Sequence, residues 1–347
     1  MNSAIKNMEL KDMITLRTWM VVASVLTVIV VLSIQEAVIQ LALPIISKDL
    51  NVAYSSLSII ITGYWLTYGV SSLPLGKLGD LLSHRLIFLL ASIMLGGLSI
   101  LCGVIPSWES LAIFRTLAGV CVAALTANGV SILRSSFGEG RRAQVTSLWA
   151  ATISLSFIVG PSLGGVFIDF AKWEYIFTLG GILCIAIPIL LAIVLPKSAD
   201  TKLEADFDYL GACLIALFMG SLIITLNSLR DSSFSNFDPK IIVSLTIFVI
   251  SLTIFIRYER KIPNPVIRFS SFRNKQYTFA LLCGVSYATS VQGLNYLLQY
   301  YLQKVAGFTT STSGTLWMLM SVATLISNIA LGRGKGKLTP NVTFVQS

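Results

Sequence analysis

Ten stretches of about 20 mostly apolar residues follow one another along the chain, separated by short polar segments. An α-helix of about that length crosses the hydrocarbon core of a bilayer. Hydrophobic residues make up 55% of the chain and charged residues only 12%, and the mean hydropathy is +0.81. A chain with so few polar side chains must use lipid as its solvent. The sequence therefore predicts an all-α polytopic membrane protein whose first partner is the lipid bilayer.

The apolar runs define where the ten transmembrane helices are expected, to within a few residues. They lie at about 18–43, 54–76, 84–104, 108–132, 145–168, 174–195, 209–229, 240–258, 278–302 and 313–332. The formal net charge is +9. With the N-terminus in the cytoplasm, nineteen of the 25 lysines and arginines fall on the cytoplasmic side and five outside, and the remaining one is Arg115, inside a span.

This alternating excess of positive charge follows the positive-inside rule. It predicts a multi-pass protein of the cell membrane with both termini in the cytoplasm, and it explains the charge without a nucleic-acid partner. The five cysteines lie inside expected spans without a pairing pattern, and the single histidine, His84, is expected in a solvated loop. No phosphate-binding glycine loop, Ser-His-Asp set or Cys/His cluster is recognisable. The sequence therefore predicts no enzyme activity, no metal and no bound cofactor.

Two ionisable residues stand at depth inside expected helices. Glu36 is the only charged residue of the first span, and Arg115 is the only one between Glu109 and Arg134. Both lie roughly 12 Å from the outer ends of their helices, so they are at similar depth. Ionisable groups at membrane depth are costly and face a partner or a water-filled cavity. A static buried ion pair and a site that responds to protons or cations are both open, and we favour the second.

Polar side chains also recur at helical spacing. They are Ser33 with Glu36 and Gln40, Tyr64 with Tyr68, and Gln292 with Asn295, Gln299 and Gln303. Such stripes line a cavity or form hydrogen bonds to neighbouring helices. In the fifth span, Ser156, Gly160 and Gly164 form one smooth face that lets another helix approach closely, and Pro161 removes a backbone donor beside it.

Several motifs together resemble those of one transporter family, the major facilitator superfamily. They lie in Ile34–Pro44, Gly76–Asp80, Phe114–Gly119, Gly160–Gly165, Asp208–Gly211 and Tyr301–Gly307. Over about residues 20–332 the chain is similar to the 14-helix drug:proton antiporter group, which includes multidrug and tetracycline exporters. The residues that resemble the antiporter motif of the fifth helix are Gly160, Pro161, Gly164 and Gly165.

The resemblance implies an architecture in three regions. These are an N-terminal six-helix bundle at 1–195, a cytoplasmic linker with two linking helices and a basic loop at 196–276, and a partial C-terminal bundle of two helices with a polar cytoplasmic tail at 277–347. Because the family has four further helices, the resemblance also implies a chain truncated at its C-terminal end.

The resemblance also implies a function, which is secondary active transport. Small lipophilic or cationic compounds would leave the cell in exchange for protons, driven by the proton gradient without a cofactor. Glu36 is implied as the proton or cation carrier and Arg115 as the charge that modulates it. Gly76, Asp80 and Arg85 are implied at the cytoplasmic gate, and the glycines and proline of the fifth helix at a flexible interface.

The sequence departs from the family pattern in three ways. The usual first-helix aspartate falls at Gln35, and the acid stands one position later, at Glu36. Leu81 and Ser83 replace the arginine and glycine that normally continue the loop motif. The third departure is the length, because the family has four further helices. It leaves an alternative open, in which the chain is a truncated, non-transporting remnant or a membrane binding or assembly partner of a major facilitator.

Overall fold

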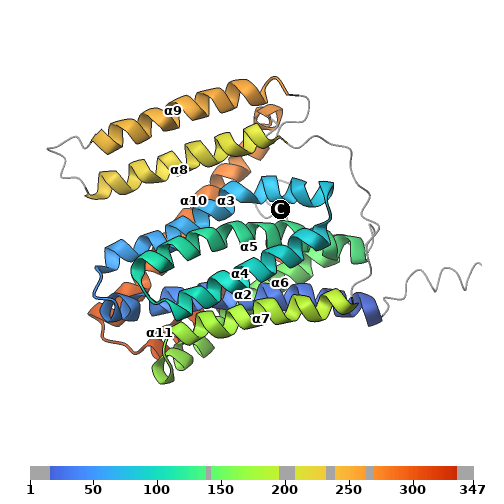
Figure 1. Ribbon diagram of the computed structural model, residues 1–347. Coiled ribbons are helices and arrows are strands. Elements are labelled where there is room, and N and C mark those ends of the chain that lie inside the picture. The colour runs from blue at the N-terminus through green and yellow to red at the C-terminus, as the bar shows by residue number, and fades with distance from the viewer. Residues whose placement is uncertain (1–15, 138–141, 195–207, 232–238, 263–268, 334–347) are drawn as a thin grey trace, which may run out of the picture.

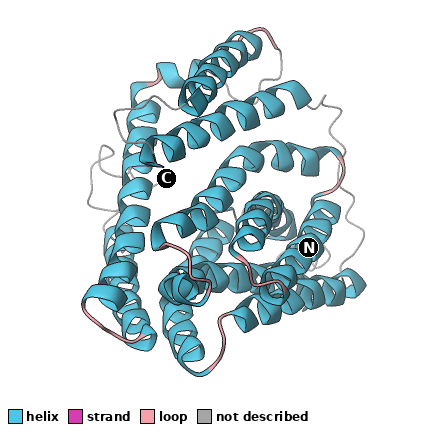
Figure 2. Cartoon of the chain, turned by 60° about the vertical axis from the view of Figure 1, so that its left-hand side comes forward, coloured by secondary structure: helices cyan, strands magenta, loops and turns pink. Residues whose placement is uncertain are grey.

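The computed structural model describes residues 16–137, 142–194, 208–231, 239–262 and 269–333. Within these ranges the chain contains no β-strand, and its helices are joined by short loops (Figure 2). The long helices of these ranges are α2 (Leu16–Asp49), α3 (Ser58–Leu81), α4 (His84–Val104), α5 (Trp108–Phe137), α6 (Arg142–Phe170), α7 (Glu174–Val194), α8 (Tyr209–Asp231), α9 (Pro239–Glu259), α10 (Lys275–Tyr300) and α11 (Thr310–Arg333). Short helical turns are η1 (Tyr54–Leu57), η3 (Phe269–Arg273) and the π-helical η4 (Tyr301–Val305).

Each of these long helices coincides with one expected span, and the all-helical prediction is confirmed. Among the described residues, five helices are long and apolar enough to cross a membrane by length and composition: Thr18–Asp49, His84–Val104, Trp108–Phe137, Ser147–Phe170 and Pro239–Glu259. The described apolar parts of α7 and α8, Glu174–Ile189 and Cys213–Leu226, are shorter. Both termini and the polar tail lie outside the described residues, and the division into three regions stays a prediction.

The expectation that the second span ends at about residue 76 is wrong, because Gly76–Asp80 are helical. The helix α3 continues through Pro74 to Leu81, and only Leu82 and Ser83 separate it from α4. The fall in hydropathy after residue 75 marks the end of an apolar run but not of the helix. The last turns of α3 remain helical because they pack closely against α5.

The helix α2 lies among the first six long helices, in contact with α5, α6 and α7 (Figure 1). The helix α5 packs against both α3 and α4, and α4 also packs along α7. Buried apolar side chains form two clusters along α2. One contains Val28 and Leu125, and the other contains Leu41 and Leu111. Glu36 lies on α2 between these two clusters, so its carboxylate interrupts an otherwise apolar core.

The helices α8 and α9 form a pair at the side of the bundle, and α8 packs against α3 (Figure 1). The rings of Phe218 and Phe255 hold the pair together, with centroids 5.5 Å apart. The carboxylate of Asp208 accepts a hydrogen bond from the backbone N–H of Gly211 at 2.8 Å and from the hydroxyl of Tyr258 at 3.0 Å. Asp208 therefore caps the start of α8 and ties it to the end of α9.

The last two long helices differ in how far neighbouring helices cover them. The helix α11 packs along α6, whereas α10 is exposed along most of its length. The helix α10 contacts the preceding part of the chain beside η1. There the hydroxyl of Tyr54 donates to the backbone carbonyl of Tyr296 at 3.2 Å, and the hydroxyl of Tyr296 donates to the carbonyl of Tyr54 at 3.1 Å.

Candidate functional site

Glu36 of α2 and Arg115 of α5 form a buried ion pair. The Nη2 atom of Arg115 donates to Oε2 of Glu36, and the two residues are 3% and 6% exposed. Charges removed from solvent to this degree persist as a pair, because removing either partner leaves an uncompensated buried charge. The structure thus brings together the two charges that the sequence places at similar depth.

The ring of Tyr64 completes the surroundings of the guanidinium. Its centroid lies 4.1 Å from Cζ of Arg115, which is within cation–π range. The ring is held there because α3 and α5 approach each other closely. A Cβ atom on Gly119 would collide with the carbonyl oxygen of Tyr64, and one on Gly63 would collide with the hydroxyl of Thr116. Small residues permit such close backbone approach between membrane helices.

One oxygen of the carboxylate has no hydrogen-bond partner. Within the described part of the chain, Oε1 of Glu36 and Nε of Arg115 are buried and unpaired. A buried polar atom without a partner is costly, so it is a site where a proton, a water molecule or a ligand group would bind favourably. Glu36 therefore has one oxygen engaged by Arg115 and one open.

Gln35 faces a different helix from Glu36. Its Nε2 atom donates to the carbonyl of Ile176 on α7 at 3.4 Å, and its side chain lies against Gly180 of the same helix. Successive residues on a helix are rotated by about 100°, so moving the acid by one position changes the helix that it meets. The acid at Glu36 meets α5, whereas position 35 meets α7.

The other polar residues expected to line a cavity in the first half of the chain are mostly packed. Gln40 and Tyr64 are buried, and Ser33 and Tyr68 are half-buried. The ring of Trp65 stands edge-on between those of Tyr64 and Tyr68, with centroid distances of 5.4 and 5.5 Å. In this conformation these rings form a packed row along α3.

The polar stripe of α10 divides into two parts. Gln303, in η4, donates from Nε2 to the carbonyl of Leu41 on α2 at 3.0 Å. Gln299 is 1% exposed, and neither polar atom of its amide has a partner among the described residues. Gln292 and Asn295 are half-buried. One end of the stripe therefore joins α10 to α2, while the amide of Gln299 remains unsatisfied.

The Gly-Pro segment of α6 faces α2 on one side. A Cβ atom on Gly164 would collide with the side chain of Val38, and one on Gly160 would come within 3.3 Å of the Cα of Ile34. The glycines thus permit the two helix backbones to approach. This is the close-packed face that the small-residue spacing predicts.

The same segment faces α11 on its other side. Gly314 of α11 lies against the carbonyl of Pro161, and a Cβ atom on Gly165 would lie 2.7 Å from the carbonyl oxygen of Thr310. Glycines on both helices therefore make this contact. The helix α6 is sandwiched between α2 and α11 by its small residues.

The residues expected at the cytoplasmic gate gather around the turn between α3 and α4. Oδ1 of Asp80 lies 3.1 Å from Nε2 of His84. A Cβ atom on Gly76 would make an ordinary contact of 3.5 Å with Ala127 of α5. Arg85 follows in the first turn of α4 and makes interactions of its own.

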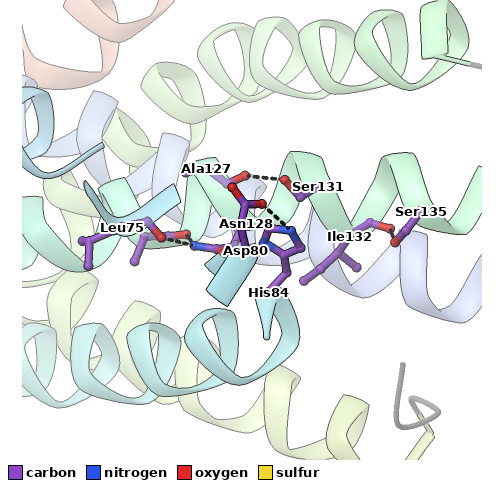
Figure 3. A network of polar contacts seen from close by, with 9 residues as sticks. Leu75, Asp80, His84, Ala127, Asn128, Ser131, Ile132 and Ser135 are labelled. Carbon is purple, nitrogen blue, oxygen red and sulfur yellow. Dashed lines mark hydrogen bonds and ion pairs between the residues drawn. The ribbon is translucent and has the colours of Figure 1, made fainter. Parts of the chain in front are cut away.

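Two residues of this network were not predicted. The expectation that His84 is solvated is wrong, because its side chain is only 21% exposed and its Nδ1 lies 2.8 Å from Oδ1 of Asn128 on α5 (Figure 3). The available signal was Asn128 itself, an amide inside an apolar helix, which needs partners when it is buried. The described residues contain no group of three His, Cys, Asp or Glu side chains that could hold a metal ion.

Several bacterial export proteins are similar in sequence to most of this chain. The tetracenomycin C resistance and export protein of Streptomyces glaucescens is 24% identical, over 91% of this chain and 59% of that protein. The multidrug export protein EmrB of Escherichia coli (strain K12) is 27% identical, over 88% and 59%. The multidrug efflux pump SdrM of Staphylococcus aureus (strain N315) is 27% identical, over 98% and 73%. The chain thus spans about 59% of the length of the first two relatives.

A solved structure shows the same fold. It is the crystal structure of a bacterial homologue of the human lysosomal transporter Spinster, in an inward-facing and unoccupied conformation. The TM-score is 0.63 at 15% sequence identity, with 94% of this chain and 64% of that chain covered. The family model of the Major Facilitator Superfamily matches residues 25–345. The chain therefore belongs to the major facilitator superfamily, whose members are multi-pass membrane transporters and not enzymes.

Proposed function

We propose that this chain carries the coupling site of a transporter that moves small lipophilic or cationic compounds out of the cell in exchange for protons. The observation that carries the proposal is the buried pair of Glu36 and Arg115, in which one carboxylate oxygen has no partner. The export proteins to which the chain is similar support the proposed direction and class of substrate.

The pair offers two states that differ by one proton. When Glu36 is ionised, its charge is compensated by Arg115, and α2 is tied to α5. When Oε1 takes up a proton, the Coulombic attraction is lost, and the guanidinium keeps the ring of Tyr64 as its neighbour. Proton binding therefore loosens α2 from α5, and the contact with Gly160 and Gly164 provides a smooth face along which α2 shifts against α6.

The compound would pass between the first six helices and the last two. The residues proposed to border its path are Ser33, Gln40, Tyr64, Tyr68, Gln292, Asn295 and Gln299. Aromatic rings near a carboxylate favour a cation that carries apolar groups. The cytoplasmic gate would be the network of Gly76, Asp80 and Arg85, and the excess of basic residues supports placing this end and both termini in the cytoplasm.

Transport in cells without other drug pumps tests the proposal. Cells expressing the chain are loaded with ethidium, and efflux is followed with and without an imposed pH gradient. Efflux that depends on the gradient and is lost in Glu36→Gln supports the proposal. Glu109→Gln is the matched control, because it removes an exposed carboxylate at the start of α5. Equal efflux in Glu36→Gln would remove Glu36 as the coupling residue.

A second candidate function is binding or assembly without transport. One observation favours it: α10 is exposed along most of its length. The two candidates are separated by comparing the 347-residue chain with a version extended by four helices from a relative. Efflux by the extended version alone would favour the second candidate for the shorter chain.

A further inference from the structure

His84, the first residue of α4, joins three helices through its two ring nitrogens. Nδ1 lies 2.8 Å from Oδ1 of Asn128 on α5, and Nε2 lies 3.1 Å from Oδ1 of Asp80 on α3 (Figure 3). Both distances fit hydrogen bonds. The protons on this ring therefore decide whether both contacts exist at the same time.

The orientation of the Asn128 amide is fixed by its other hydrogen bonds. Its Nδ2 atom donates to the carbonyl of Leu75 at 3.1 Å and to the carbonyl of Ala124 at 2.8 Å. Turning the amide over would place its oxygen against two carbonyl oxygens in a fully buried position. Oδ1 therefore faces His84, and because Oδ1 only accepts, the ring must carry a proton on Nδ1.

The second nitrogen also faces an acceptor. An ionised carboxylate has no proton to donate, so Nε2 of His84 must carry a proton to bond to Asp80. Both contacts together require a doubly protonated, positively charged ring. When the ring loses one proton, the partner Asn128 keeps the remaining one on Nδ1, and Nε2 turns a lone pair toward the carboxylate.

The surroundings of Asp80 make its contact with His84 depend on the proton on Nε2. Gly79, directly before Asp80, allows the approach, since a Cβ atom there would collide with the side chains of Asn128 and His84. The Asp80 side chain is 44% exposed, so water reaches the carboxylate side of the contact. Asn128 lies on the buried side.

We propose that His84 is a pH-sensitive bridge that fastens the turn between α3 and α4 to α5. The doubly protonated ring holds Asp80 and Asn128 together. Loss of one proton releases the Asp80 contact and loosens the turn. The bridge is therefore complete while the ring holds both protons and opens when a rising pH removes one of them.

Other charged groups lie on the helices that pack here. Lys77 on α3 and Arg85 on α4 make interactions of their own, and Arg134 lies one to two turns beyond Asn128 on α5. The helix α8, which packs on α3, begins beside Asp208, whose carboxylate is held as its cap. The side chain of Asn128 bonds to His84, Leu75 and Ala124, so the Nδ1 contact distinguishes the bridge from general charge attraction to Asp80.

The single histidine of the chain permits a direct test on the unmodified protein. The full chain is labelled with ¹⁵N-histidine in lipid nanodiscs, and the nitrogen chemical shifts are recorded from about pH 5 to about pH 9. The bridge predicts a doubly protonated ring at low pH that converts to the tautomer with its proton on Nδ1. Conversion to the tautomer with its proton on Nε2 would overturn the proposal.

A second measurement tests the mechanical consequence. A spin label at Leu82→Cys, in a background without the five native cysteines, reports on the turn. Its mobility is expected to rise with pH in the parent chain and to be independent of pH in His84→Gln, which keeps polarity but does not titrate. A label at Val104→Cys, at the other end of α4, is the control. Equal pH dependence with and without His84 would contradict the bridge.

Discussion

Glu36 and Arg115 meet where one apolar cluster of the core ends and the other begins. The cluster on one side contains Val28 and the cluster on the other contains Leu41. Apolar packing on both sides keeps the effective dielectric constant low, which strengthens the attraction and raises the cost of breaking it. Breaking the pair by removing one charge is therefore costly.

Removing one charge of the pair is expected to destabilise the protein more than removing both. Arg115→Met leaves Glu36 buried without a countercharge, at a cost of about 3–5 kcal/mol by comparison with buried pairs elsewhere. Adding Glu36→Leu removes the uncompensated charge and should restore most of the loss. Thermal unfolding in detergent measures the comparison. A double variant as unstable as Arg115→Met would contradict the pairing.

The face of the Tyr64 ring, and not its hydroxyl, is expected to contribute to the stability of the protein. Tyr64→Phe keeps the cation–π contact with Arg115 and should leave stability nearly unchanged. Tyr64→Leu loses the contact, worth about 0.5–2 kcal/mol. The two variants are compared by thermal unfolding at equal expression. Equal losses in both would show that the hydroxyl, and not the ring face, carries the effect.

The contact between α6 and α2 predicts that a second substitution restores the stability lost by a first one. Gly164→Ala places a methyl group against Val38, and overpacking of this kind costs about 1–3 kcal/mol. Combining it with Val38→Ala should recover stability, because the methyl group then finds space. Gly220→Ala is the matched control, since nothing lies within 4 Å of its Cβ position. The idea fails if Val38→Ala makes Gly164→Ala worse.

Two glycines of the same motif are expected to respond differently. Gly79→Ala collides with Asn128 and His84, whereas Gly76→Ala makes an ordinary contact with Ala127. Gly79→Ala should therefore lower the unfolding temperature, and Gly76→Ala should leave it unchanged or raise it slightly, since alanine favours helices. Thermal unfolding of the two variants checks this. Equal sensitivity would contradict the observed packing of α3 on α5.

The proposed orientation predicts which turns are accessible from outside. A cysteine at Lys172 should react with an impermeant maleimide in intact cells, and a cysteine at Leu82 only after permeabilisation. Both positions are exposed. The labelling is performed without the five native cysteines. The reverse pattern would overturn the assignment based on basic residues.

Hydropathy and depth made much of this fold predictable from the sequence. The apolar runs locate the helices because only helices satisfy every backbone group within lipid. The pairing of Glu36 with Arg115 followed from their similar depth. The small-residue spacing at Gly160 and Gly164 correctly indicated a close helix contact.

The sequence could not predict which neighbouring helix each side of a helix contacts. The difference between Gln35 and Glu36 is a rotation of about 100°, which acquires meaning only when α5 and α7 are placed. The contact of His84 with Asn128 joins residues 44 positions apart and has no periodic signal. The end of α3 was misplaced because a polar stretch remained helical through tertiary packing.

The central claim is that Glu36 couples proton movement to export. It is tested most directly by following the pH gradient in inside-out membrane vesicles containing the chain, while a cationic dye such as ethidium is added. Addition is expected to dissipate the gradient in the parent chain and in Glu109→Gln, but not in Glu36→Gln. Dissipation by Glu36→Gln equal to that of the parent would contradict the account.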